Sequence, residues 1–302
     1  MYHYVREIKN SKYPNIKGLE FKEFKKQINY FIKNFNILSN DDIIEILNTN
    51  KLPKKKSILL TFDDGYIDHW KYVYPFLKEK RITGNFYVPT NIIKKNHILD
   101  VNKIHFILER EDNKLKIIDF IFDNLNKKIF KKIKRDLDKI NILNRYDDVN
   151  TLKIKKILQI FLPDHTKRKI INLLFNEYVK INKVNFAKEL YMSSDHLVQM
   201  YKDKMHIGSH GCNHSWMNKL DYGKQYKEIK TSLNFFKKIG VYDNNFSFCY
   251  PYGSFNLDTF KILKEFNFKY ALTTIVGSLN KKNIKNNFLI PRYDTNDFIK
   301  FI

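Results

Sequence analysis

The chain has 302 residues, enough for one large α/β barrel or for two ordinary domains. Its 55 Lys and Arg against 32 Asp and Glu give a formal charge of +23, and its two cysteines are too few for a disulfide framework. The sequence has neither an apolar leader near its first residues nor a run of about 18 apolar residues. We therefore expect a cytoplasmic protein, with peripheral contact to the inner face of a membrane as an open alternative.

The positive charge has two interpretations. It would suit an anionic partner such as an acidic glycan, a membrane surface or a nucleic acid. Lys, Asn and Ile are, however, abundant along the whole chain, which is typical of a biased genome composition. The sequence contains no paired CxxC motif, no aromatic RNA-binding motif and no basic helix with heptads. We therefore expect no nucleic-acid partner.

Two blocks of the sequence alternate short apolar strands with helices. In the first block, residues 57–62 and 84–90 are expected to be strands that flank a helix at residues 72–82. The expected strands and helices of the second block are, in chain order, residues 205–210, 226–240, 246–253, 257–268, 270–275 and 287–294. This βαβ pattern predicts a parallel sheet with functional residues at the carboxyl ends of its strands.

The middle of the chain has a different pattern. Over residues 97–200, Ile, Leu and Phe recur at three- and four-residue spacing among lysines, which predicts amphipathic helices. Because the strands on both sides follow one pattern, we interpret residues 1–302 as a single domain with a discontinuous core, residues 1–96 and 201–302. Residues 97–200 would then be a helical insertion. A separate helical domain is the alternative.

Two adjacent aspartates, Asp63 and Asp64, follow the first predicted strand in the sequence LLTFDDGY. Neighbouring side chains of a strand point to opposite faces, so both carboxylates can enter one site only where the strand ends and the backbone turns. Gly65 permits such a turn. Two close carboxylates repel each other unless a cation or a shared proton offsets their charge. The motif therefore indicates a metal site.

A histidine pair supplies further candidate ligands. In SHGCNH, His210 and His214 are four residues apart, and on a helical turn this spacing would place both rings on one face, where they can bind one ion. The spacing alone is a weak signal. Gly208 and Gly211 on either side of His210 favour a tight junction between strand and loop. Cys212, between the two histidines, is expected to point away from the ion.

Taken in order, TFDDGY, IGSHGCNH and YPYG resemble the first three motifs of the NodB-like polysaccharide deacetylases, carbohydrate esterase family four. The resemblance covers the two α/β blocks and leaves the helical middle unmatched. It implies a distorted (β/α) barrel of the polysaccharide deacetylase type with one divalent metal ion bound by Asp64, His210 and His214. Zinc is the expected ion, and cobalt, nickel or manganese are alternatives for such a ligand set.

The resemblance also implies catalytic roles. Asp63 would be the general base, and the main-chain amide of Tyr252, directly after Pro251, would help to hold the oxyanion. Pro251, Leu289 and His69 are expected at substrate-binding positions, with Leu289 near the methyl group of an acetyl substrate. The roles of Asp63, Tyr252, Pro251 and Leu289 follow from the family motifs and not from spacing, whereas His69 is a candidate because it lies close to a strand end that should face the site.

The sequence departs from the family pattern in two places. Many members have an Arg where this chain has Cys249, but one branch supplies an Arg from the last strand, and Arg292 in IPRYD occupies that place. We therefore predict that Arg292 pairs with Asp63. Many members also carry a catalytic acid, a histidine, in the last strand, where FLIPR has none. His3 is the expected substitute, and His69 is a second candidate.

The resemblance implies a metal-dependent hydrolase that cleaves the amide bond of an N-acetylated amino sugar, and not a peptide bond. The expected partner is an acetylated sugar or glycan linked to a nucleotide, a lipid or a polymer, in surface glycan or polysaccharide biosynthesis. A sugar O-deacetylase or an N-deformylase would use similar chemistry and stays an alternative. A catalytically silent glycan-binding module is the alternative from a different class.

Overall fold

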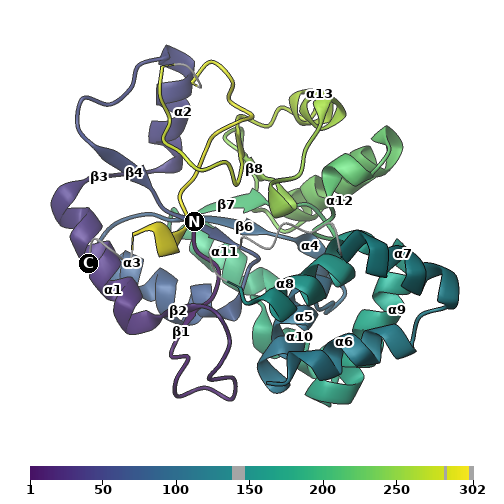
Figure 1. Cartoon of the computed structure of the whole chain (residues 1–302). Helices are drawn as coiled ribbons and strands as arrows, with labels where there is room; N and C mark the ends of the chain where they lie inside the picture. Colours follow the sequence, from purple (N-terminus) through teal and green to yellow (C-terminus); the bar gives the residue numbers. More distant parts are fainter. Residues whose placement is uncertain (138–146, 282–283, 299–302) are drawn as a thin grey trace. The chain divides into compact units, whose positions relative to one another are not determined.

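The computed structural model describes residues 1–137, 147–281 and 284–298, and the chain divides into two compact units (Figure 1). Unit 1 comprises Met1–Glu7, Gly18–His97 and Ala187–Ile302, and unit 2 comprises Ile8–Lys17 and Ile98–Phe186. The helical insertion that we predict over residues 97–200 begins where the longer part of unit 2 begins. Unit 2, however, ends at Phe186 and also includes the short segment Ile8–Lys17 near the start of the chain.

Unit 1 contains a curled parallel sheet of five strands (Figure 1). In sheet order the strands are β5 (Thr61–Asp63), β6 (Asn85–Val88), β7 (His206–Ser209), β8 (Phe248–Cys249) and β9 (Ala271–Leu272). Single parallel bridges extend the sheet at both edges, from Tyr2 to Phe62 and from Leu272 to Ile290. The predicted parallel arrangement is confirmed, and it brings the carboxyl ends of all five strands to one edge.

The prediction of a single strand over residues 57–62 is wrong. The chain forms two short strands there, β4 (Ser57–Leu59) and β5, which pair with different partners on either side of Leu60. β4 pairs with β3 (Asn36–Leu38), whereas β5 pairs with β6. A further parallel pair joins β1 (Val5–Arg6) to β2 (Leu19–Glu20). The prediction of a strand over residues 287–294 is also wrong, since within this range the structure has a single bridge residue, Ile290.

The sheet of unit 1 is covered on both faces, which explains its apolar strands. All four residues of β6 and all four of β7 are buried, as is usual for parallel strands between layers of helices. Aromatic rings fill the space behind β5. The ring of Phe62 stacks on Tyr2 at 5.0 Å and on Phe86 at 4.8 Å, measured between centroids.

The helices of unit 1 begin and end at recognisable signals. α12 (Tyr222–Lys238) starts after Asp221, whose side chain accepts a hydrogen bond from the amide of Lys224, and it ends just before Gly240 in a left-handed conformation. The other helical segments that lie in unit 1 are α1 (Phe21–Asn34), α2 (Asn40–Thr49), η1 (His69–Val73), α3 (Tyr74–Glu79), α4 (Thr90–Lys94), α11 (Ser194–Lys202), η4 (Met217–Lys219), η5 (Pro251–Gly253), α13 (Leu257–Glu265) and η6 (Thr295–Asp297).

Unit 2 is helical, as its apolar spacing predicts. Its helical segments are α5 (Asp100–Arg110), α6 (Lys114–Asp123), α7 (Lys127–Leu137), α8 (Val149–Lys156), η2 (Ile157–Phe161), α9 (Asp164–Leu174) and η3 (Phe175–Val179), and the border with unit 1 falls within α10 (Lys183–Leu190). The core of unit 2 includes the buried rings of Phe106 and Phe175 and fully buried aliphatic side chains, among them Ile107, Ile117, Ile121, Ile154, Leu158, Ile170, Ile171 and Leu174.

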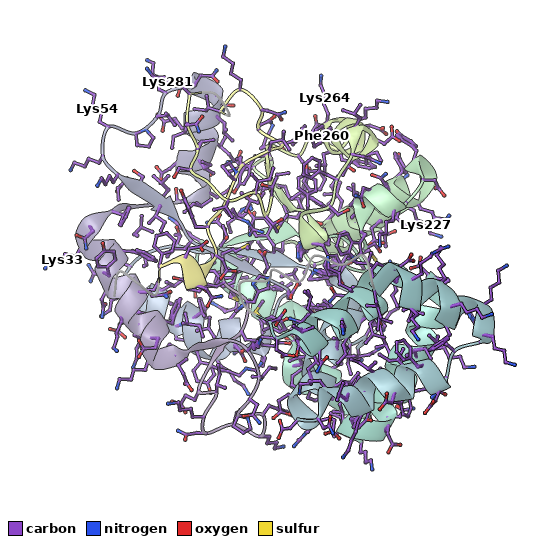
Figure 2. The ribbon with its side chains drawn as sticks, in the orientation of Figure 1. Lys33, Lys54, Lys227, Phe260, Lys264 and Lys281 are labelled. Atoms are coloured by element: carbon purple, nitrogen blue, oxygen red, sulfur yellow. The ribbon has the colours of Figure 1, made fainter. Side chains whose placement is uncertain are left out.

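Lysine side chains project outward at many separate places on unit 1. Figure 2 labels five of them, Lys33, Lys54, Lys227, Lys264 and Lys281, and all five are exposed. This spread agrees with the interpretation of the charge as a bias of composition. Among the helices of the described ranges, none combines the length and the apolar character that crossing a bilayer requires.

Candidate active site

The two adjacent aspartates lie at the carboxyl end of β5, where the backbone turns as predicted. Asp63 is the last residue of β5, and the chain then passes through two left-handed residues, Asp64 with φ 74° and Gly65 with φ 67°. Aspartate tolerates this conformation better than most residues, and glycine adopts it without strain. A Cβ atom on Gly65 would lie 2.8 Å from a methyl carbon of Val88. The motif therefore needs glycine for its conformation and for space.

The histidine pair lies on a loop that follows β7, so the predicted helical turn is wrong. Between Ser209 and Met217 the chain is irregular, and Gly211 and His214 have positive φ angles of 75° and 57°. The carboxylate of Glu228 on α12 is buried beneath this loop and accepts hydrogen bonds from the main-chain amides of Cys212 and Asn213. The loop therefore owes its shape to a partner from a distant helix.

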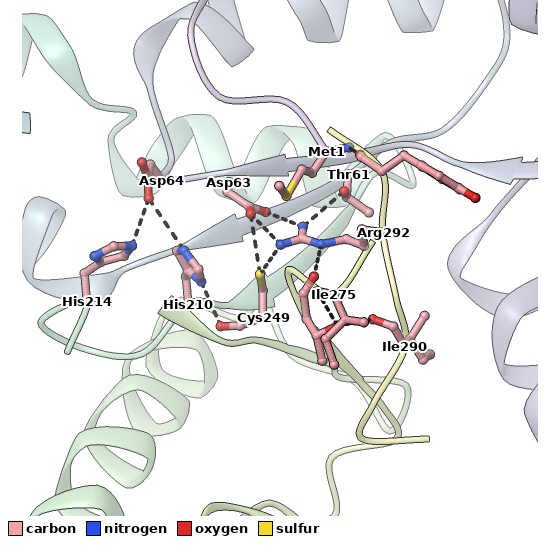
Figure 3. Close-up of polar contacts among 12 residues, drawn as sticks. Met1, Thr61, Asp63, Asp64, His210, His214, Cys249, Ile275, Ile290 and Arg292 are labelled. Atoms are coloured by element: carbon pink, nitrogen blue, oxygen red, sulfur yellow. Dashed lines mark hydrogen bonds and ion pairs between the residues drawn. The ribbon is translucent and has the colours of Figure 1, made fainter. Parts of the chain in front are cut away.

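His210, His214 and Asp64 converge on one small space (Figure 3). The Nε2 atoms of His210 and His214 lie 3.6 Å and 3.3 Å from Asp64 Oδ1, and one candidate ligand atom from each residue lies within 4.8 Å of the others. All three side chains are buried. The Nδ1 atom of His210 must donate to the carbonyl oxygen of Cys249, at 2.7 Å, because a carbonyl only accepts. This bond leaves Nε2 of His210 as the ligand atom.

These three residues fit a divalent metal ion. Asp64 Oδ1 is buried without a hydrogen-bond partner, although Asp64 Oδ2 accepts a bond of 2.7 Å from the hydroxyl of Tyr66. Burial lowers the pKa of His210 to about 4, and burial followed by the charge of His3 lowers that of His214 to about 3. Both rings are therefore neutral near pH 7, which is the form that binds metals. Two imidazoles and a carboxylate suit zinc and other first-row ions.

The second aspartate, Asp63, forms a buried ion pair with Arg292, as the sequence predicts (Figure 3). Nη1 of Arg292 donates to Asp63 Oδ1 at 3.0 Å and Nη2 donates to Asp63 Oδ2 at 2.9 Å. Arg292 also donates from Nε to the carbonyl of Thr273 and from Nη1 to the hydroxyl of Thr61. Burial alone would raise the pKa of Asp63, but the charge and hydrogen bonds of Arg292 hold it well below its usual range. Asp63 is therefore ionised.

Cys249 adds a thiol to this ion pair, a contact that sequence reasoning missed. Its Sγ accepts from Nη2 of Arg292 at 3.1 Å and donates to Asp63 Oδ2 at 3.5 Å. Burial raises the pKa of Cys249 well above its usual value, so the thiol is neutral. Asp63, His210 and Cys249 form a second cluster of possible metal ligands. We favour the site at Asp64, because the guanidinium of Arg292 already contacts two members of this second cluster.

Tyr252 lies beside the histidine pair in the short segment η5. Its φ and ψ are 58° and 14°, a left-handed conformation that costs a bulky residue about 1–2 kcal/mol. The Tyr252 ring makes a T-shaped contact with His214, at 4.5 Å between centroids, and it stacks on Trp216 at 4.3 Å. Pro251, directly before it, is buried. No sequence motif pointed to Trp216 as a residue of the site.

The other predicted residues have different surroundings. The side chain of His3 is exposed. Burial raises the pKa of Asp63, and among the groups that lower it His3 ranks after Arg292 and His210. Leu289 is half-buried next to Ile290, and its contact with an acyl group stays a prediction. His69, in contrast, is 0% exposed, packs against Phe62, and its Nε2 bonds to the carbonyl of His3 at 2.8 Å. This burial argues against the direct substrate contact, or role as acid, expected of His69.

Comparison with known proteins identifies the family of this chain. The family model described as polysaccharide deacetylase matches residues 50–271. The chain belongs to the polysaccharide deacetylase family. A curated relative from Bacillus subtilis (strain 168), the putative polysaccharide deacetylase YxkH, is 28% identical over 102 residues, which are 33% of this chain and 34% of the relative. The match thus spans about a third of that relative's length.

Solved structures of deacetylases share the fold of this family member. Streptococcus pyogenes deacetylase PplD in complex with acetate matches with a TM-score of 0.60 and 17% identity, over 97% of this chain and 88% of that one. A de-N-acetylase from Aggregatibacter actinomycetemcomitans matches with a TM-score of 0.55 and 16% identity, over 100% and 97%. The predicted barrel of the polysaccharide deacetylase type is thereby confirmed.

Proposed function

We propose that this polysaccharide deacetylase family member removes the N-acetyl group from an amino sugar in surface glycan or polysaccharide biosynthesis, with the help of one divalent metal ion. One observation carries the proposal. The adjacent carboxylates of Asp63 and Asp64 have separate partners, since Asp64 faces two neutral histidines and Asp63 is ionised against Arg292. Such a division suits one metal ligand and one general base.

The residues of the chain have distinct tasks in this reaction. Asp64, His210 and His214 would hold the ion, most suitably zinc, with cobalt, nickel or manganese as other options. When bound, the ion would supply a Lewis acid that polarises the acyl carbonyl. Asp63 accepts a proton from the attacking water, and the bidentate contact with Arg292 fixes its orientation.

Two further groups complete the proposed site. The main-chain amide of Tyr252 donates a hydrogen bond to the oxygen that gains negative charge as water adds to the acyl carbon. Cleavage of the carbon–nitrogen bond then requires a proton on the leaving nitrogen. His3 is the proposed donor, because its side chain is exposed and its charge lowers the pKa of both Asp63 and His214. The products are acetate and a free amine.

Mass spectrometry of defined substrates tests the proposed reaction. Purified protein is incubated with N-acetylated, O-acetylated and N-formylated amino sugars, each in nucleotide-, lipid- and polymer-linked form. We expect loss of one acetyl group from an N-acetylated substrate, and no loss with Asp63→Asn, which keeps the shape of the side chain but cannot take up the proton. Loss only from the O-acetylated or N-formylated compounds, or equal activity of Asp63→Asn, would contradict the proposal.

We further propose that α7 contacts the anionic surface of a membrane. Six of its eleven residues are Lys or Arg, and these six side chains are exposed, whereas Ile133 is buried. Within α7 the one acidic residue is Asp136, which lies 3.8 Å from Arg135. Each cation near an anionic lipid surface contributes about 1 kcal/mol to binding. Such contact would suit a substrate carried on a lipid.

A further inference from the structure

Tyr252 adopts a backbone conformation that its side chain disfavours. Its φ of 58° lies in the left-handed region, which a bulky aromatic residue rarely adopts. Gly253 follows with a φ of 65°, so two successive left-handed residues shape this turn. A disfavoured conformation persists only where surrounding contacts hold it in place. The N–H of Tyr252 lies in the peptide plane that precedes its Cα atom, so the direction of this amide depends on the φ angle of Tyr252.

Trp216 makes a stacked aromatic contact with Tyr252. The two rings are nearly parallel, with 4.3 Å between centroids and an interplanar angle of 9°. The Nζ atom of Lys219 lies 4.9 Å from the centroid of the Trp216 ring. Tyr252 in turn contacts His214 at 4.5 Å. The Tyr252–His214 contact is T-shaped, with 66° between the ring planes, so the stacked pair of Trp216 and Tyr252 ends against a proposed metal ligand.

Hydrogen bonds also join the turn that contains Tyr252 to the segment that contains Trp216. The hydroxyl of Ser254 accepts a bond of 3.1 Å from the main-chain amide of Asn218, and it donates one of 2.7 Å to the side-chain oxygen of Asn218. Ser254 is buried. These bonds anchor the end of the turn, two residues beyond Tyr252, to the segment that carries Trp216. The ring contact with Trp216 therefore acts directly on Tyr252. The hydrogen bonds between Ser254 and Asn218 keep the turn next to Trp216.

We propose that Trp216 is a positioning residue for deacetylation, because its ring holds Tyr252 in the left-handed conformation that directs the Tyr252 amide toward the substrate. This inference rests on the proposed function. Tyr252 occupies one face of the indole ring, and Trp216 is half-buried, so we assign Trp216 to the support of Tyr252 and not to direct contact with the sugar. Its effect on catalysis therefore passes through Tyr252 and falls on kcat rather than on KM.

The chain offers a matched control, because its second tryptophan, Trp70, is stacked in a similar way on residues that have no role in the proposed site. The ring of Trp70 lies 5.1 Å from Tyr74 and 4.5 Å from His196, with interplanar angles of 15° and 17°. Replacement of Trp70 therefore removes a comparable stack and leaves Tyr252 unchanged. The test compares Trp216→Ala, Trp216→Leu and Trp216→Phe with Trp70→Ala and Trp70→Phe, all as full-length protein.

The kinetic test uses the N-acetylated sugar that the wild type deacetylates. Loss of a whole oxyanion donor costs about 10²- to 10³-fold in kcat, and Trp216→Ala misdirects the donor without removing it. We therefore expect a loss of about 10- to 100-fold in kcat with KM within about threefold of the wild type. Trp216→Phe, which can still stack, should recover most of kcat, and both Trp70 variants should be near wild type. Should Trp216→Ala fail to fold, Trp216→Leu takes its place.

A second readout does not depend on turnover. Hydrogen exchange of the main-chain amides of residue 250 and residues 252–254 should be faster in Trp216→Ala than in wild type and in Trp70→Ala, while metal content stays the same. Wild-type kcat together with unchanged exchange in Trp216→Ala would overturn the inference, as would a full loss of kcat in Trp216→Phe. A wild type without any deacetylase activity, combined with faster exchange in Trp216→Ala, would instead overturn the proposed function and leave the role of Trp216 in holding Tyr252 supported.

Discussion

Removal of Arg292 should both destabilise unit 1 and stop catalysis. Asp63 is 2% exposed and its two carboxylate oxygens bond to Arg292, so Arg292→Ala leaves a buried negative charge without its partner. Such a loss costs about 3–5 kcal/mol of folding free energy, a large part of the roughly 5–15 kcal/mol that stabilises a typical domain. Turnover should fall by about 10²- to 10⁴-fold, the usual contribution of a positioned general base.

Urea unfolding followed by tryptophan fluorescence measures the stability term, because both tryptophans of the chain lie in unit 1. Arg292→Lys keeps the charge but loses the bidentate geometry, so its stability and turnover should lie between those of wild type and Arg292→Ala. The double variant Asp63→Leu with Arg292→Met should regain stability without regaining activity, since neither charge is left unpaired. Wild-type stability and turnover in Arg292→Ala would refute this reasoning.

Three further perturbations test other parts of the structure. Gly253→Ala should destabilise the chain by about 1–3 kcal/mol more than Gly240→Ala in denaturant unfolding, because both glycines have positive φ but only at Gly253 would a Cβ atom meet a neighbour, at 2.0 Å; equal losses would contradict this difference. Burial lowers the pKa of His206 from 6.5 to about 3, so its contribution to stability is complete above pH 6.5 and falls by about 1.4 kcal/mol per pH unit as the pH drops from 6.5 toward 3. His206→Gln should flatten the dependence of unfolding free energy on pH in this window, and an unchanged slope would count against it. Replacement of the six cations of α7 by Gln should abolish salt-sensitive pelleting with anionic vesicles, whereas equal pelleting of wild type with neutral and anionic vesicles would refute membrane contact through α7.

The features that sequence could predict are those set by neighbouring residues. The turn after β5 follows from two adjacent aspartates before a glycine, and the structure has left-handed angles at Asp64 and Gly65. The pairing of Arg292 with Asp63 was predictable for another reason. A buried carboxylate needs a cation, and the family resemblance indicated which one would supply it.

The features that sequence could not predict depend on contacts between distant segments. The loop of His210 and His214 is irregular because Glu228 of α12 binds two of its amides, and the spacing of the histidines carries no sign of that partner. His69 is buried because aromatic residues from β5 and β6, Phe62 and Phe86, enclose it. The break at residue 60 has a similar origin, since the residues on either side of it pair with different strands.

The metal content of purified protein tests the central claim most directly. Elemental analysis of the wild type, loaded with zinc and freed of unbound ion, should find about one ion per chain, and Asp64→Ala or His214→Ala should hold far less. His206→Gln serves as the control, because His206 is buried and bonds to Ser247 rather than to the proposed ligands, and it should retain the wild-type content. Equal metal content in wild type, Asp64→Ala and His214→Ala would contradict a metal site at these residues.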